Sequence, residues 1–194
     1  MLASRILKTT VIGIAVVLFA LNVSFAFEDD GFGQARKIQS SHFTVYYSPQ
    51  IDATTLAQQL NIRPADEILT GKTSRRTNSS SEQLAEMLDT LFMRVCDIMD
   101  MQLYSYTGNI KICQDYNQLS QIYRNIFGHD FQHRKSFYVN ELNTVYISAD
   151  SFQREILGHE IAHAIISHYF VVLPSIKIQE VLAGYVEYQL RKSQ

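Results

Sequence analysis

The sequence predicts a single domain of the α+β class, and three observations lead to this prediction. Hydrophobic residues make up 46% of the 194 residues and charged residues 19%, which is typical of a folded globular chain. Short β-branched and aromatic runs occur among longer stretches of helical periodicity, in the order strand, helices, strand, helix, hairpin, helix, helix. After residue 26, no linker-like stretch divides the chain into two domains.

The first half of the chain carries one strand and two helices. Residues 42–48 (HFTVYYS) are rich in β-branched and aromatic residues and predict a strand. Residues 52–60 predict a short helix, and the polar residues 61–80 predict a loop. Ser79 and Glu82 have the spacing of a capping box, so a long amphipathic helix is expected to follow.

The second half contains more strands and helices. We expect a strand at 109–113, then a helix capped by Asp115 that ends at Gly128. Residues 136–140 and 144–148 predict a β-hairpin. Asp150, with Gln153 three residues later, predicts the start of a helix that runs to about Phe170. Pro174 and Ser175 then precede a last helix that ends near Lys192.

Residues 1–26 have the three parts of a secretory signal peptide. Arg5 and Lys8 form the positive region, residues 11–21 form the apolar region, and Ser24-Phe25-Ala26 supplies small residues at the cleavage site. We therefore expect export, to the periplasm or beyond the cell, of a mature chain that begins at Phe27. The alternative is that residues 1–26 are retained as a membrane anchor, but the apolar run is short for a span, which needs about 20 residues. After cleavage no stable membrane span is expected.

Charge and cysteine content narrow the functional classes. The formal net charge of −2 gives no basic excess for a nucleic-acid surface. Cys96 and Cys113 both lie in the mature part, and an oxidising compartment permits a disulfide between them. The alternative, that each is a small buried hydrophobic residue, stays open.

His159-Glu160-Ile161-Ala162-His163 is an H-E-x-x-H motif within a predicted helix. Residues four apart on a helix point to the same side, so both imidazoles can reach one metal ion. Glu160 projects beside that ion and can accept a proton from water. Gly158 and Ala162 leave space around the motif.

A catalytic zinc ion takes three protein ligands and keeps one position for water. Glu180 is the best candidate for the third ligand, because the chain can turn at Pro174 and return antiparallel. Glu187 lies two turns further on the same face and is either a second candidate ligand or a hydrogen-bond acceptor for a ligand histidine. His168 lies on another side of its helix.

With Glu180 in its E-x-x-A-x-Y context, this motif resembles the gluzincin metallopeptidases, the thermolysin-like clan, and especially the compact peptidase-MA-like, single-domain members. The resemblance covers residues 151–190. It implies a minimal zincin-like domain over residues 27–194, in which a small mixed sheet carries an active-site helix and a following ligand helix. His159, His163 and Glu180 would bind one zinc ion, and Glu160 would be the general base. The strand at 144–148 would be the edge that binds an extended substrate.

Two departures from the gluzincin pattern affect residues around the metal. Larger members often have an acidic residue four positions after the ligand glutamate, and Gly184 stands there in this chain. Another acidic group must then orient the first histidine, and Glu187 and Glu155 are the candidates. Larger members also take a transition-state donor from a further subdomain. The local candidates for that role are Tyr185, Tyr188 and His168.

These residues predict an exported zinc-dependent metallohydrolase, with peptidase activity on peptide or protein substrates. Two alternatives remain at the level of sequence. The first is a catalytically inactive zinc-binding domain that acts as an adaptor or sensor. The second is a core helix with two chance histidines and no metal.

Overall fold

The computed structural model describes residues 30–63, 79–132 and 135–193. The predicted signal peptide and most of the predicted polar loop at 61–80 lie outside the described residues. Within them, no helix has both the length and the apolarity needed to cross a bilayer. The described part is mixed α/β, which agrees with the predicted α+β class.

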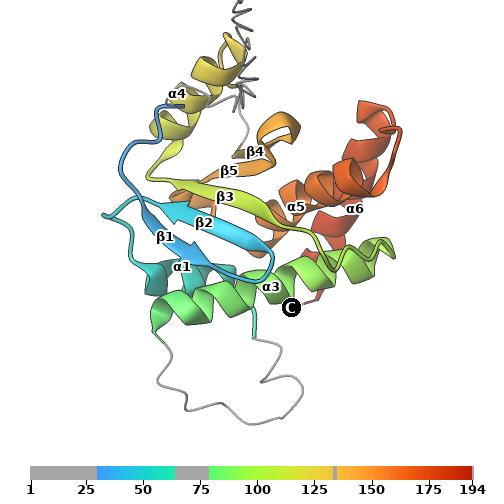
Figure 1. Ribbon diagram of the computed structural model, residues 1–194, viewed down its shortest axis with the longest axis horizontal. Coiled ribbons are helices and arrows are strands. Elements are labelled where there is room, and N and C mark those ends of the chain that lie inside the picture. The colour runs from blue at the N-terminus through green and yellow to red at the C-terminus, as the bar shows by residue number, and fades with distance from the viewer. Residues whose placement is uncertain (1–29, 64–78, 133–134, 194) are drawn as a thin grey trace, which may run out of the picture.

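A five-stranded mixed sheet lies at the centre of the described residues (Figure 1). Its strand order is β1-β2-β3-β5-β4. The three inner strands β2, β3 and β5 are parallel, and β1 and β4 are antiparallel to their neighbours. The strands are β1 (Arg36–Gln39), β2 (Phe43–Tyr47), β3 (Gly108–Cys113), β4 (Ser136–Val139) and β5 (Thr144–Ser148).

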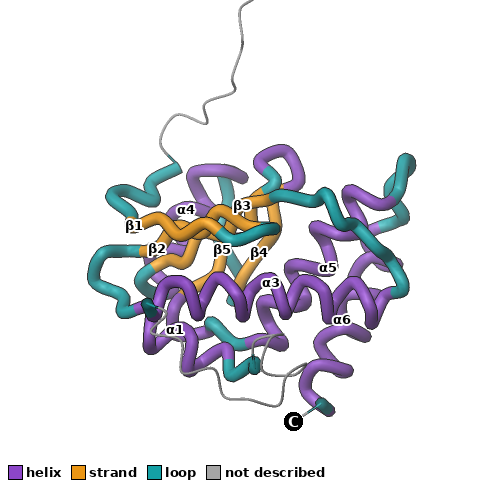
Figure 2. Tube along the Cα trace, turned by 60° about the horizontal axis from the view of Figure 1, so that its bottom comes forward, coloured by secondary structure: helices purple, strands orange, loops and turns teal. Residues whose placement is uncertain are grey.

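The helices cover the two faces of the sheet unequally, as the turned view in Figure 2 shows. Four of the described helices lie on one face, and α4 alone lies on the other. The helices are α1 (Ala53–Leu60), α3 (Ser80–Met99), α4 (Tyr116–Phe127), α5 (Arg154–Tyr169) and α6 (Ile176–Lys192). Successive side chains along each strand point to opposite faces of the sheet, so a hydrophobic core forms on each face. Ile110 and Ile112 of β3 face the larger core, while Cys113 faces the smaller core under α4.

Local sequence signals placed most helix ends correctly. The Asp52 side chain accepts a hydrogen bond from the backbone of Thr55 at the start of α1. Ser79 and Glu82 form the predicted reciprocal capping box of α3. Asp115 caps α4, and Gly128 ends it with a left-handed φ of 74°.

The predicted cap at Asp150 is wrong. Residues Ala149–Ser151 form a short 3₁₀ turn, and α5 begins only at Arg154, after Gln153. Phe152 lies between the two elements with a non-helical ψ of 75°, and its side chain is fully buried in the larger core. Burial of this aromatic ring therefore outweighs the local capping signal.

The prediction that residues 144–148 form the sheet edge is also wrong. β5 pairs with β3 on one side and with β4 on the other, so β4 is the edge strand next to α5. On the opposite edge, β1 was not predicted, because its sequence Arg-Lys-Ile-Gln offers one apolar residue, Ile38.

A disulfide between Cys96 and Cys113 is not formed. Both thiols are free and buried. Cys96 lies on α3 in the larger core, and Cys113 lies in the smaller core on the other face of the sheet. The sheet therefore separates the two sulfur atoms. Burial raises the pKa of both thiols, so both stay protonated and weakly nucleophilic at neutral pH.

We predict that both thiols of the folded protein react slowly with an alkylating reagent at neutral pH and that both react rapidly after denaturation without reductant. Mass spectrometry of the alkylated protein counts the labels. Labelling that requires a reductant in denaturant would contradict the two free thiols.

Candidate metal centre

The two histidines of the motif lie one turn apart on α5 and point to the same side. The rest of this helix is anchored in the larger core through Leu157, Ile161 and Ile165, all fully buried. This anchoring leaves the half-buried imidazoles at the surface of the core. His159 Nε2 and His163 Nε2 lie 3.3 Å apart.

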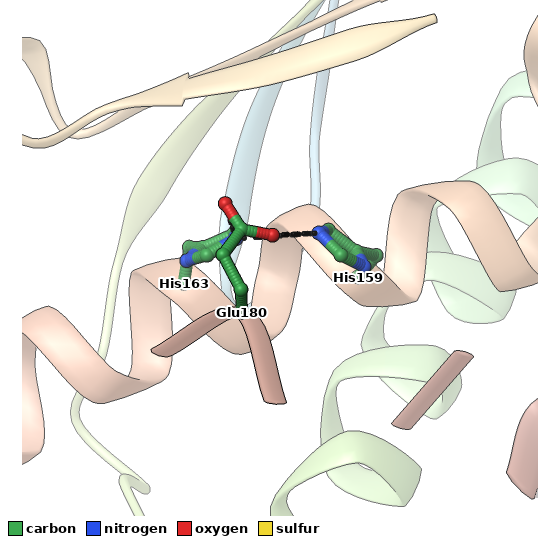
Figure 3. Close-up of side chains that lie close together, drawn as sticks. All are labelled: His159, His163 and Glu180. Carbon is green, nitrogen blue, oxygen red and sulfur yellow. Dashed lines mark hydrogen bonds and ion pairs between the residues drawn. The ribbon is translucent and has the colours of Figure 1, made fainter. Parts of the chain in front are cut away.

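Glu180 reaches the same point from the first turns of α6 (Figure 3). Glu180 Oε2 lies 3.4 Å from His159 Nε2, and Glu180 Oε1 lies 3.8 Å from His163 Nε2. Three side chains from two antiparallel helices therefore converge, and each offers one atom within 4.8 Å of the others. The sequence prediction that these three residues come together agrees with this geometry.

The donor set and its spacing fit a zinc ion. Tetrahedral zinc with bonds of about 2.0–2.1 Å keeps its ligand atoms about 3.3–3.4 Å apart. The distances from His159 Nε2 to the other two donors match this separation. Two imidazoles and one carboxylate are also the ligands of hydrolytic zinc sites that leave a position open.

A close approach of α5 and α6 sets the position of Glu180. A Cβ atom added at Gly158 would lie 2.2 Å from Leu190 Cδ1 and 3.7 Å from Val186 Cγ1. Leu190 is fully buried, so its side chain could give way only within the packed core. A residue without a side chain at Gly158 therefore allows α6 to pack directly on the motif helix.

Glu160 lines the same cleft as His159 and Glu180. Its carboxylate Oε1 accepts a 2.7 Å hydrogen bond from the Ser136 hydroxyl. The exposed fraction of Glu160 is 7%, and Ser136 is also buried. Alternation along β4 explains the contact: Phe137 and Val139 face the smaller core, so Ser136 and Tyr138 face α5. The edge strand thus fixes the carboxylate.

Glu187 stands behind His159. Its Oε2 lies 3.5 Å from His159 Nδ1, a buried nitrogen with no hydrogen bond of good geometry. The guanidinium of Arg191, one turn further on α6, binds the other oxygen of Glu187. Glu187 therefore has the place predicted for an acceptor that orients a ligand histidine, and not that of a ligand. The other candidate, Glu155, pairs with Arg154.

An open cleft of about 640 Å³ adjoins His159, Glu160 and Glu180. Its remaining lining residues are Lys135, Ser136, Gln153, Glu155, Ile156, Glu187 and Arg191. Tyr185, Tyr188 and His168 do not line it. The two tyrosines are exposed on α6, and His168 Nδ1 lies 2.9 Å from the carbonyl oxygen of Ala164, with its ring against Tyr106. The predicted transition-state donors are therefore not in this cleft.

No protein-family model, curated protein or solved structure matches this chain. The chemical interpretation of the site therefore rests on its geometry.

Sequence analysis missed Ser136, Lys135 and Arg191. Ser136 and Glu160 are 24 residues apart, and only the pairing of β4 with β5 brings the serine to α5. Arg191 could have been found, because it lies four residues after Glu187 on one helix.

We predict that Gly158→Ala destabilises the fold by about 1–3 kcal/mol, because the new methyl group must displace Leu190 or move α6. It should also weaken metal binding, since a shift of α6 moves Glu180 away from the histidines. Thermal unfolding and metal titration measure the two effects.

Gly184→Ala is the matched control on α6. A Cβ at Gly184 meets nothing within 4 Å, so this variant should gain about 0.5–1 kcal/mol from helix propensity. Equal melting temperatures for the two variants would contradict the role of Gly158 as the packing contact.

Proposed function

We propose that this protein is a zinc-dependent metallohydrolase that cleaves peptide bonds, and that it acts after export and removal of residues 1–26. The observation that carries the proposal is the convergence of His159, His163 and Glu180, with His159 and Glu180 lining the same cleft as the buried carboxylate of Glu160. A metal site without hydrolysis has no need for a buried carboxylate held in place at that position.

His159, His163 and Glu180 would hold the ion. When bound, zinc acidifies water and polarises a carbonyl group, which is the chemistry that peptide hydrolysis needs. Glu187 would accept a hydrogen bond from His159 Nδ1, which fixes the tautomer that leaves Nε2 free to donate its electron pair. Arg191 keeps the Glu187 carboxylate in place.

Glu160 would accept the proton from the attacking water and deliver it to the leaving amine. Glu160 Oε1 accepts a hydrogen bond from the Ser136 hydroxyl, and this bond holds the carboxylate in one rotamer. A general base of this kind typically contributes a factor of about 10² to 10⁴ to the rate.

The substrate would bind in extended form along β4. This strand starts at Ser136, and among the described strands it pairs with β5 alone, so its outer edge can accept a further strand. Peptide or protein substrates present the backbone N–H and C=O groups that such an edge requires.

Glu160→Gln should retain zinc and the melting temperature and lose at least about 100-fold in peptide cleavage. Glutamine is nearly isosteric and accepts the Ser136 hydrogen bond, but it does not take up a proton. Elemental analysis and digestion of a peptide library measure both properties. Zinc in both proteins with cleavage by neither would favour the alternative, an inactive zinc-binding adaptor or sensor. Equal cleavage by both would contradict the role of Glu160.

Ser136→Ala should lower kcat by about 10-fold or more at unchanged zinc content, because Glu160 loses the hydrogen bond that orients it. Ser136→Thr keeps the hydroxyl and should restore most of the rate. Steady-state kinetics with a peptide found in the library digest provide the comparison. If alanine and threonine lower kcat equally, the effect comes from packing and not from the hydrogen bond.

Glu180→Ala should release zinc far more readily than Glu187→Ala. The first change removes a ligand, while the second removes an orienting acceptor, whose loss usually costs about 10- to 100-fold in affinity or activity. Competition with a chelator ranks the two variants. Metal loss in Glu187→Ala with retention in Glu180→Ala would reverse the assignment.

A further inference from the structure

α6 and the connection between α5 and α6 expose a series of large apolar side chains. In the connection, Val171 is 103% exposed and Val172 is 82% exposed, so both project fully into solvent. This connection stands at the periphery of the molecule in Figures 1 and 2. We call the whole surface the outer apolar face, and its members are Tyr169, Val171, Val172, Leu173, Ile176, Ile178, Val181, Tyr185 and Tyr188.

The helical part of this face is regular. Ile178, Val181, Tyr185 and Tyr188 follow each other at intervals of three and four residues, so they form one stripe along α6. The buried face of the helix, formed by Ala183, Val186 and Leu190, packs on α5 and lies on the opposite side. The stripe is therefore not needed for the fold, and an exposed apolar surface of this extent indicates an interaction site.

Within α6 and the connection before it, the charges on the side of the outer apolar face have one sign. Residues 161–179 contain no Asp or Glu. Lys177 and Lys192 are exposed at the two ends of the stripe, on its side of the helix by the 3.6-residue period. The two acidic residues of α6, Glu180 and Glu187, point instead toward His159.

We propose that the outer apolar face binds the surface of a lipid bilayer that carries anionic headgroups. Val171 and Val172 would enter the acyl boundary, the tyrosines would lie at headgroup level, and the two lysines would contact lipid phosphates. Exposed aliphatic side chains, tyrosines and flanking lysines are the residue types with which proteins bind the membrane interface. The proposal does not depend on zinc or on hydrolysis.

Lysine placement disfavours a second copy of the chain as the partner. An antiparallel pair of α6 helices that sets Val181 opposite Tyr188 also sets Lys177 opposite Lys192 at both ends. A parallel pair sets each lysine opposite its own copy. Both arrangements bring like charges together, whereas an anionic bilayer neutralises both lysines.

The test is co-sedimentation of the purified protein with vesicles of phosphatidylcholine, with and without phosphatidylglycerol. We expect binding to the anionic vesicles that weakens as salt rises. Val171→Asp/Val172→Asp should weaken it by at least about 10-fold, while the control Val171→Leu/Val172→Leu keeps it. Lys177→Gln should weaken it about fivefold, and the control Lys37→Gln, at the far edge of the sheet, should not change it.

Wild type and variants are compared as the same mature chain, without residues 1–26, so binding by that segment does not enter the comparison. Chelator-treated protein should bind equally well. Equal binding by the Asp and Leu variants would overturn the proposal. A dimer in analytical ultracentrifugation that Val181→Arg dissociates would also overturn it, because the face would then join two copies.

Discussion

The packing of α6 on α5 at Gly158 is the contact on which the proposed metal centre depends. The H-E-x-x-H helix supplies two donors and Glu160, but the third donor comes from another helix. The Leu190 side chain occupies the space that a methyl group at Gly158 would need. The apolar core therefore determines the distance between the helices, and that distance places Glu180 over both histidines. The metal does not have to create this arrangement, because hydrophobic burial already does.

The three carboxylates near the histidines differ in environment, and the differences separate their chemical roles. Glu180 is the most exposed and faces both Nε2 atoms, as a ligand requires. Glu160 is buried against the edge strand, and the Ser136 hydroxyl holds its carboxylate in place. A general base needs such a fixed position. Glu187 is paired with Arg191 behind His159 and suits an orienting role. Contacts from β4, α5 and α6 thus give the three carboxylates distinct environments.

Features encoded by local sequence could be predicted, and features that depend on distant contacts could not. The histidine spacing and the caps at Ser79 and Asp115 depend on neighbours within one turn, and all of these predictions agree with the structure. Asp150 failed as a cap because burial of Phe152 outweighs a local signal. The role of Ser136 depends on which strand forms the sheet edge, and a hairpin pattern does not specify that order. The position of Glu180 near the histidines was predictable, because the short connection after α5 makes α6 return antiparallel along it.

The central claim is that two imidazoles and the Glu180 carboxylate hold one zinc ion. X-ray absorption at the zinc edge of the purified protein tests it most directly, because the method reports ligand type and distance without any assay of activity. The proposed site requires about one zinc per chain, with nitrogen and oxygen ligands alone at about 2.0–2.1 Å, including two imidazoles. A sulfur ligand at about 2.3 Å, or a protein that binds no zinc at saturating concentration, would contradict the assignment.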